Sequence, residues 1–489
     1  MNSLESKVVT AAKWSALTEI ASKLISPIAG MILARLLTPE AYGAVATTTI
    51  IISFAELFTD AGFQKYIIQH DFADDDDRDK SINVAFWTNL VMSLIIWGVI
   101  IVFRYPIARI VGSPGLETAI VVACAAIPIA AFSSIQNAIY KRNLNFRVPF
   151  IVRMIGLGIT FFVTIPLAFW LQSYWALIIS KIIQGLVAAF VLTLYSDWKP
   201  TLYYSFKRFK EMFGFCFLIM TRSLLVWIDN YLDVFLVSNK FDQTTLGLYK
   251  TSISRPNNIL KIVSNPVIPI LLPTFSKLQN DVPELTKTML KIQKYLGLII
   301  LPIGFVIFLY SETITRICWG KQWMDAAPLI GIWGLIHAFS LLINHFCGKV
   351  FIAIGKPSIS VIISSIFTIS LIPTTLISVN YGFKALFISC SILRIILIAL
   401  HLIATYILIK LSPFRIFGNL LPELIGCALM VAITYFLSTF CDNVVLQLIS
   451  MAVCSAAYIC FLFSIKSERT IIRNIYAHTT NSILGKNCL

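Results

Sequence analysis

The sequence predicts an all-α membrane protein of about fourteen transmembrane helices, and three observations support this fold class. Of the 489 residues, 58% are hydrophobic and only 13% are charged, whereas a soluble domain usually carries about 25% charged residues. Apolar stretches of the ~20 residues needed to cross a bilayer recur along the whole chain. Lysines and arginines concentrate in alternate gaps between these stretches, as the positive-inside rule predicts.

The apolar stretches define fourteen predicted spans. In chain order they cover residues 12–33, 41–65, 82–103, 116–139, 149–171, 173–195, 211–238, 247–273, 289–310, 326–354, 357–378, 383–409, 417–438 and 444–465. With the N-terminus in the cytoplasm, about 22 basic residues fall in cytoplasmic gaps and 7 in the opposite gaps. Both termini are therefore expected in the cytoplasm, which requires an even number of crossings.

Several other functional classes are disfavoured. The formal charge of +15 is spread over short gaps between spans, so it does not form the basic face of a nucleic-acid-binding domain. Motifs of zinc proteases, serine hydrolases and phosphate-binding loops are missing, and no cofactor or metal site is expected. His337 and His345 share one apolar span and are expected as core or polar-cavity histidines rather than metal ligands. Asp74 to Asp77 are expected to form a solvated turn.

A weak internal repeat places a glycine near the start of two predicted spans. Gly43 follows Ala41-Tyr42, and Gly247 follows Thr245-Leu246, six spans later. An even offset of six helices would make the two halves parallel repeats about an axis along the membrane normal, which is a known plan of transporters.

Fifteen ionisable side chains lie inside the predicted spans. The cations are Lys13, Lys23, Arg153, Lys181, Arg222, Lys250, Arg255, Lys261, Lys349 and Arg394, and the acids are Glu19, Glu56, Asp60, Asp229 and Asp233. A charge facing lipid at mid-bilayer costs about 2.5–3.5 kcal/mol. Fifteen such costs would exceed the usual net stability of a fold, about 5–15 kcal/mol. Most of these residues must therefore line a hydrated cavity or pair with one another.

The spacing of some charges favours shared helix faces. Arg222, Asp229 and Asp233 are spaced at i, i+7 and i+11, which forms one stripe along a helix. Glu19 and Lys23 are an i, i+4 pair in the favourable order. Two alternatives remain open: Glu19–Lys23 as a purely structural pair, and snorkelling of cations that lie near helix ends.

The excess of cations over acids indicates a site for a polyanionic head group such as a diphosphate. Arginine binds phosphate oxygens in a bidentate manner and lysine supplies a compact charge. The candidate substrate-binding residues are Arg222, Arg255, Lys23, Arg153, Lys181, Lys250, Lys261, Lys349 and Arg394. The acids respond to burial and to neighbouring charge, which makes Asp229, Asp233, Glu19, Glu56 and Asp60 the candidates for a coupling ion.

Three segments resemble a known transporter family. They read LARLLTPEAYG at 33–43, KRNLNFR at 141–147 and LLPTFSKLQ at 271–279. These segments are similar to those of Wzx-type polysaccharide exporters, the branch of O-antigen, colanic acid and teichuronic acid flippases. That branch belongs to the multidrug/oligosaccharidyl-lipid/polysaccharide superfamily. The resemblance covers about residues 8–410 in order.

The resemblance implies two pseudo-symmetric six-helix lobes, 1–200 and 201–412, two additional helices within 413–466, and a cytoplasmic tail, 467–489. It also implies a transporter rather than an enzyme. Such a protein moves undecaprenyl-diphosphate-linked oligosaccharides across the bacterial inner membrane by alternating access, for O-antigen, capsule or exopolysaccharide assembly. Membrane lipids, a coupling proton or cation, and other polysaccharide assembly proteins are the further expected partners.

Two alternatives remain. One is an ion-coupled small-molecule or drug antiporter of the same superfamily, which would have a more acidic or aromatic cavity. The other is a membrane-bound glycosyltransferase or polymerase, which usually carries a large extracytoplasmic loop or an acidic catalytic motif in a loop.

Overall fold

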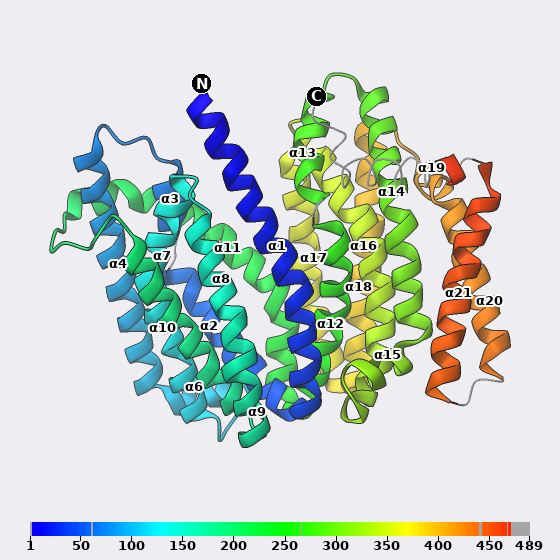
Figure 1. Ribbon diagram of the computed structural model, residues 1–489, viewed down its shortest axis with the longest axis horizontal. Helices are drawn as coiled ribbons and strands as arrows, with labels where there is room; N and C mark the ends of the chain where they lie inside the picture. Colours follow the sequence, from blue (N-terminus) through cyan, green and yellow to red (C-terminus); the bar gives the residue numbers. More distant parts are fainter. Residues whose placement is uncertain (1, 60–61, 266, 440–442, 467, 471–489) are drawn as a thin grey trace. The chain divides into compact units, whose positions relative to one another are not determined.

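The computed structural model describes residues 2–59, 62–265, 267–439, 443–466 and 468–470, and these residues form helices joined by short turns (Figure 1). The predicted tail therefore lies almost wholly outside the described residues. The chain divides into two compact units, Met1–Lys250 and Thr251–Leu489, and each unit has its own hydrophobic core. The lobes predicted at 1–200 and 201–412 stay a prediction.

Thirteen helical segments of the described chain are long and apolar enough to cross a membrane. They coincide with the predicted spans except for the one at 247–273. That segment contains α12 (Gln243–Ser264), a helix of 22 residues, about 33 Å long at 1.5 Å per residue. It carries Lys250, Arg255 and Lys261, which make it too polar to be recognised by hydropathy. The all-α multi-pass fold is confirmed, and a count of fourteen crossings stays a prediction.

The described residues of the first unit form eleven complete helices and the start of α12. They are α1 (Asn2–Leu36), α2 (Pro39–Thr59), α3 (Phe63–Gln69), α4 (Asp75–Val102), α5 (Arg104–Ile110), α6 (Glu117–Cys124), α7 (Ala126–Arg142), α8 (Arg147–Ile159), α9 (Ile165–Leu171), α10 (Trp175–Tyr195) and α11 (Phe206–Lys240). Within this unit α7 packs between α4 and α10, and α2 packs against α11 (Figure 1).

The aspartate run is part of a helix rather than the predicted turn. The Asp74 side chain accepts a hydrogen bond from the Asp77 backbone N–H at 2.6 Å, and Asp75 to Asp77 form the first turn of α4. Carboxylates are favourable at a helix N-terminus because they cap free N–H groups and oppose the helix dipole. The run therefore starts a transmembrane helix, and Asp74, Asp75 and Asp76 are exposed as expected.

The two glycines of the predicted repeat lie against each other in the first unit. A Cβ atom on Gly43 would collide with the backbone carbonyl of Gln243, and one on Gly247 would collide with the carbonyl of Pro39. The starts of α2 and α12 thus meet backbone to backbone. Glycine at both positions follows from this close approach.

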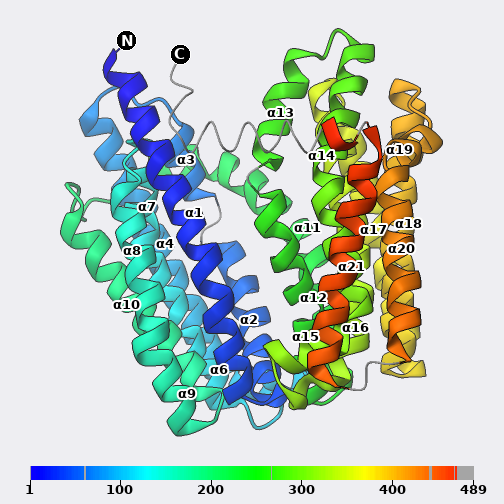
Figure 2. The same cartoon turned by 45° about the vertical axis from the view of Figure 1, so that its right-hand side comes forward.

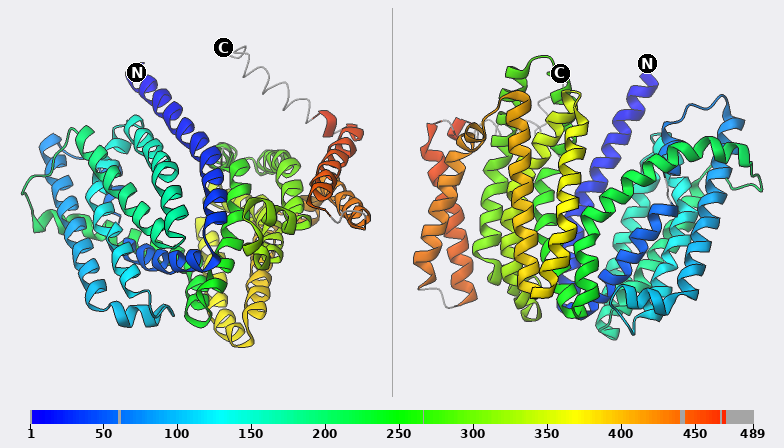
Figure 3. Two further views of the ribbon diagram at one scale, coloured as in Figure 1. Left: turned by 60° about the horizontal axis from the view of Figure 1, so that its bottom comes forward. Right: turned by 180° about the vertical axis from the view of Figure 1, so that it is seen from behind.

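In the second unit, the described residues form the rest of α12 and nine further helices. They are α13 (Ile268–Lys277), α14 (Val282–Leu309), α15 (Ser311–Cys318), α16 (Ala327–Ala353), α17 (Pro357–Ser378), α18 (Phe383–Ile409), α19 (Pro413–Asn419), α20 (Leu421–Ser438) and α21 (Val444–Ser464). Helix α16 packs against α14, α17 and α18, and α17 and α18 run side by side (Figure 3).

The last two transmembrane helices share the core of the second unit. Both α20 and α21 pack against α14 (Figure 2). The Tyr458 hydroxyl on α21 donates a hydrogen bond to the Leu298 carbonyl at 3.2 Å, and the Tyr310 and Ser450 hydroxyls lie 2.7 Å apart. Buried hydroxyls of this kind find partners because an unpaired polar group in an apolar interior is costly.

Candidate functional site

The predicted site residues fall in both units. The side chain of Arg222 and the whole of Asp60 lie outside the described residues, so nothing is inferred from their positions. Most of the remaining candidates gather in three places: on α12, α16 and α18 in the second unit, and at α1 with α8 and at α11 with the start of α12 in the first. Glu56 lies apart from these, in a polar cavity.

The second unit brings three predicted cations together around two histidines. Electrostatic interactions connect His337 with Arg394 and Lys261, and His345 with Lys261 and Lys349. These five residues, which we call the cation–histidine cluster, come from α12, α16 and α18. Three positive side chains thus share one neighbourhood, and two of them, Lys349 and Arg394, lie on helices long and apolar enough to cross a membrane.

Aromatic rings hold the arginine of this cluster. The Arg394 guanidinium lies 4.6 Å from the centre of the Trp333 ring and 5.9 Å from that of Phe367. The Trp333 and His337 rings stack at 5.4 Å. A cation is stabilised by the face of an aromatic ring, and a guanidinium group is suited to bidentate binding of anionic oxygens. The buried Nε2 of His337 has no hydrogen-bond partner among the described residues.

In the first unit, α1 and α8 place three candidates close together. Lys23 and Glu19 form the predicted i, i+4 ion pair at 3.1 Å. The Arg153 Nε on α8 donates to the Ser22 hydroxyl at 2.9 Å. Ser22 is adjacent to Lys23, so both cations lie at the contact between α1 and α8. Lys181 is separate, exposed on α10.

The acidic part of the predicted stripe on α11 meets the start of α12. Asp233 is 2% exposed, and the Tyr249 hydroxyl donates to its Oδ2 at 3.0 Å. Lys250 lies with its Nζ 4.6 Å from the centre of the Tyr231 ring. Asp229 is half-buried on α11, and Arg255 is half-buried further along α12. Asp233 is thus a buried and hydrogen-bonded carboxylate, whereas Glu56 is exposed.

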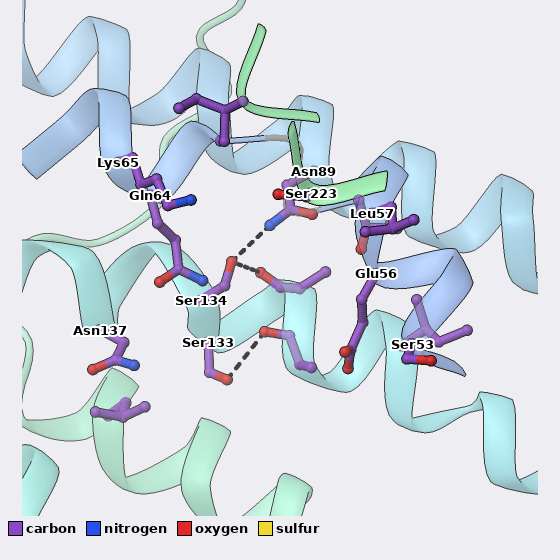
Figure 4. A pocket seen from close by; sticks show the side chains of 17 residues that line it. Ser53, Glu56, Leu57, Gln64, Lys65, Asn89, Ser133, Ser134, Asn137 and Ser223 are labelled. Atoms are coloured by element: carbon purple, nitrogen blue, oxygen red, sulfur yellow. Dashed lines mark hydrogen bonds between the residues drawn. The ribbon is translucent and has the colours of Figure 1, made fainter. Parts of the chain in front are cut away.

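A polar cavity of about 500 Å³ lies between α2, α3, α4, α7, α10 and α11 of the first unit. Figure 4 shows side chains from these helices turned toward a common space. The polar and charged lining residues are Ser53, Glu56, Thr59, Gln64, Lys65, Asn89, Ser133, Ser134, Asn137 and Ser223. Only Glu56 among them was predicted, because the charge pattern directed attention to ionisable side chains.

A sequence signal for this cavity exists. Ser133, Ser134 and Asn137 interrupt an otherwise apolar span, and residues at i, i+1 and i+4 fall on one side of a helix. Asn89 interrupts the preceding span in the same way. Neutral polar residues inside several neighbouring spans therefore indicate a polar cavity as clearly as charges do.

Comparison with known proteins assigns the chain to a family. A family described as "Polysaccharide biosynthesis protein" matches residues 32–328. The chain belongs to this family. The matched region includes every helix that lines the polar cavity and all of α12, but it ends before Lys349 and Arg394.

Curated relatives of this polysaccharide biosynthesis protein agree with the assignment. The succinoglycan biosynthesis transport protein ExoT of Rhizobium meliloti is 23% identical over 66% of the chain, and the match spans 64% of ExoT. The teichuronic acid biosynthesis protein TuaB of Bacillus subtilis is 20% identical over 74% of each chain. The lipopolysaccharide biosynthesis protein WzxC of Escherichia coli is 21% identical over 67% of the chain and 66% of WzxC. The match therefore spans slightly less than two thirds of ExoT and of WzxC.

Solved structures share the fold of this family member. The lipid II flippase MurJ, in an inward closed conformation, matches with a TM-score of 0.72 and 17% identity, covering 94% of the chain and 99% of MurJ. An inward-facing multidrug resistance transporter of the MATE family matches with a TM-score of 0.58 and 16% identity, covering 81% and 98%. The fold is therefore that of the superfamily named from the sequence.

Proposed function

We propose that the protein is a flippase that moves undecaprenyl-diphosphate-linked oligosaccharides from the cytoplasmic to the outer leaflet of the bacterial inner membrane. The observation that carries this proposal is the gathering of Lys261, Lys349 and Arg394 around two histidines in the second unit. Membership of the polysaccharide biosynthesis family, and the polysaccharide and lipopolysaccharide roles for which the relatives are named, support this proposal.

The physical argument rests on the cost of charge in a membrane. Each cation that remains in lipid costs about 2.5–3.5 kcal/mol, so a cluster of three is retained only where water or an anion compensates it. A diphosphate supplies several anionic oxygens in one compact group. Arg394 can bind two of these oxygens at once, while Lys261 and Lys349 contribute point charges. We assign these three residues to the diphosphate.

The remaining predicted cations are proposed as further contacts along the transport path. Lys23 with Arg153, and Lys250, lie at two places in the first unit, so a substrate in transit would meet positive charge in both units. We propose that alternating access exposes the diphosphate site first to one leaflet and then to the other. The polyprenyl tail remains in the lipid.

The intramembrane acids are proposed as coupling groups, and their surroundings differ. Asp233 is buried and accepts a hydrogen bond from Tyr249, so binding a proton or cation there would have to break or share that bond. Glu56 lines an open cavity and can exchange an ion without such a cost. Asp229 and Glu19 remain candidates, as does Asp60.

The cellular setting follows from the charge bias in the gaps. The excess of basic residues on one side supports a cytoplasmic location for that side and for both termini. We propose that the product feeds O-antigen, capsule or exopolysaccharide assembly, with other assembly proteins as partners. Relatives that are named as transport proteins favour transport over a catalytic role.

A reconstitution experiment tests the proposed function. A fluorescently labelled undecaprenyl-diphosphate-linked oligosaccharide, isolated from cells that lack the protein, is placed in proteoliposomes. A membrane-impermeant quencher then reports its movement between leaflets. The full-length protein should accelerate this movement, Lys261→Ala should slow it, and Lys384→Ala, at an exposed position in the first turn of α18, should not. Movement at the rate of protein-free liposomes would refute the proposal, and ethidium export in the same vesicles would favour the drug antiporter.

A further inference from the structure

We propose that the polar cavity of the first unit, with an adjoining aromatic groove, binds the sugar chain of the substrate. This inference rests on the proposed function and deepens it, because it assigns the saccharide and the diphosphate to different residues. It concerns α2, α4, α7 and α11, where Arg222 on α11 was the only substrate contact expected from the charge pattern.

The chemistry of the cavity lining suits hydroxyl groups. Side-chain amides and hydroxyls such as Asn89, Asn137 and Ser134 line it, and Glu56 and Lys65 are the charged residues among its described lining. Amides and hydroxyls both donate and accept hydrogen bonds, as sugar hydroxyls do. The volume of about 500 Å³ lies within the range of about 300–1,000 Å³ typical of small-molecule sites.

The buried side-chain oxygen of Asn89 lacks a hydrogen-bond donor among the described residues. Asn89 is 1% exposed, and its amide nitrogen donates to the Ser134 hydroxyl at 2.6 Å. Its Oδ1 is buried and has no hydrogen-bond partner among the described residues. A buried acceptor without a partner is costly. A ligand that offers O–H donors next to Asn89 would remove that cost.

The aromatic groove adjoins the cavity along α2 and α11. It shares Ser53, Leu57, Lys65 and Ser223 with the cavity and adds Trp227, Asn230 and Tyr231. The Trp227 and Tyr231 rings stack at 5.8 Å and 22°. The Trp227 indole N–H donates to the Ser53 hydroxyl at 3.0 Å, which fixes the ring. Flat aromatic surfaces of this kind bury the C–H faces of sugar rings, while amides such as Asn230 bind the hydroxyls.

A positive charge lies beside the groove. Lys250 lies with its Nζ 4.6 Å from the centre of the Tyr231 ring, and Tyr231 lines the groove but not the cavity. A saccharide in the cavity and groove would therefore have a cation beside the groove, in addition to Lys65, which lines both. Neutral polar, aromatic and cationic groups are thus present together, and they match the hydroxyls, ring faces and charge of an oligosaccharide diphosphate.

A small cation is the competing occupant. Cation sites gather several carboxylate or carbonyl oxygens at 2.3–2.6 Å for an ion such as Ca²⁺, whereas the described lining holds one carboxylate, Glu56, and the cation Lys65. The aromatic groove has no role in binding such an ion. The lining therefore favours the saccharide.

The experiment compares two lipids with the full-length protein in detergent. One is the lipid-linked oligosaccharide isolated from cells that lack the protein, and the other is sugar-free undecaprenyl diphosphate. Asn137→Ala and Trp227→Ala should each weaken binding of the oligosaccharide lipid by roughly three- to tenfold, the value of one good contact. Binding of the sugar-free lipid should change by less than about twofold. Asn380→Ala and Trp170→Ala, which alter an exposed amide and an exposed tryptophan, are the matched controls.

Three results would overturn the inference. In the first, the cavity variants lose affinity for both lipids equally, or for neither. In the second, they change the sodium dependence of binding while the ratio between the two lipids stays constant, which would make the cavity a cation site. In the third, the wild-type protein binds neither lipid, which would refute the proposed function as well. Size-exclusion profiles identify variants that fail to fold, and Asn137→Ala, at a half-buried position, is the variant least exposed to that problem.

Discussion

Polar groups inside the membrane are stabilised in different ways in the two units, by hydrogen bonds in the polar cavity of the first and by aromatic contacts in the cation–histidine cluster of the second. The cavity relies on neutral groups that hydrogen-bond to one another or to the backbone, such as Asn89 with Ser134. The cluster relies on full charges, with Arg394 held on the Trp333 ring. Neutral polar groups tolerate burial when they are paired, whereas charges require an opposite charge, water or an aromatic face.

With these two sites, one transporter can bind the sugar of its substrate through neutral hydrogen bonds and the phosphate through charge. A sugar chain varies between organisms, and hydroxyl and amide contacts can be exchanged one at a time with small losses. A diphosphate is constant, and its recognition depends on charge. We therefore expect specificity for the saccharide to reside in the first unit and the requirement for a phosphate to reside in the second.

The largest predicted effect concerns a buried ion pair in the second unit. Lys294 lies 2.5 Å from Glu468, whose side chain is fully buried, and Glu423 nearby is also buried. Lys294→Ala leaves these carboxylates without a counter-charge and should lower the free energy of unfolding by about 3–5 kcal/mol. Thermal unfolding in detergent measures this loss. Lys287→Ala removes an exposed pair with Glu284 and should change stability by less than about 1 kcal/mol; equal losses would contradict the distinction.

The second prediction tests whether the cluster binds phosphate. Arg394→Ala should weaken binding of sugar-free undecaprenyl diphosphate by roughly ten- to a hundredfold, since a hydrogen bond to a charged group contributes about 1.5–3 kcal/mol. Arg394→Lys keeps the charge but loses the planar bidentate geometry and should recover only part of the affinity. Fluorescence binding in detergent measures both variants. Affinity unaffected by Arg394→Ala would remove this residue from the site.

The third prediction concerns the close approach of α2 and the start of α12 in the first unit. Gly43→Ala places a methyl group against the Gln243 backbone and should destabilise the protein by about 1–3 kcal/mol, as overpacking does. Gly156→Ala on α8, where nothing lies within 4 Å of the added Cβ, should be neutral or stabilising by up to about 1 kcal/mol. Unfolding midpoints in detergent distinguish the two, and a tolerated Gly43→Ala would show that the helices can separate at no cost.

The smallest predicted effect concerns one neutral hydrogen-bonding hub. The Thr47 hydroxyl is buried. It lies 3.1 Å from the Ser113 hydroxyl, 3.3 Å from the Ser238 hydroxyl and 3.3 Å from the Gln243 Oε1. Thr47→Val should lower the free energy of unfolding by about 1 kcal/mol. The loss should be the same from pH 5 to 9 because none of these groups titrates. Thr221→Val, at an exposed hydroxyl, is the control. A pH-dependent loss would indicate an unrecognised charge near Thr47.

Local sequence patterns predicted the membrane class and the spans closely. The predicted span at 383–409 coincides with α18, and the one at 444–465 coincides with α21 within one residue. Hydropathy succeeds here because a helix satisfies its own backbone and its side chains face lipid, so the relevant property is local. The predicted span at 247–273 is less exact, because it runs from α12 into α13.

The sequence by itself determined that this chain crosses a membrane many times and carries more intramembrane cations than acids. Only the tertiary structure decided that Lys261, Lys349 and Arg394 lie around His337 and His345, that Asp233 accepts a hydrogen bond from Tyr249, and that neutral polar residues of five helices line one cavity. The reason is physical. Helical periodicity fixes which residues of one helix share a face, but the helix that this face meets depends on packing between segments far apart in the chain.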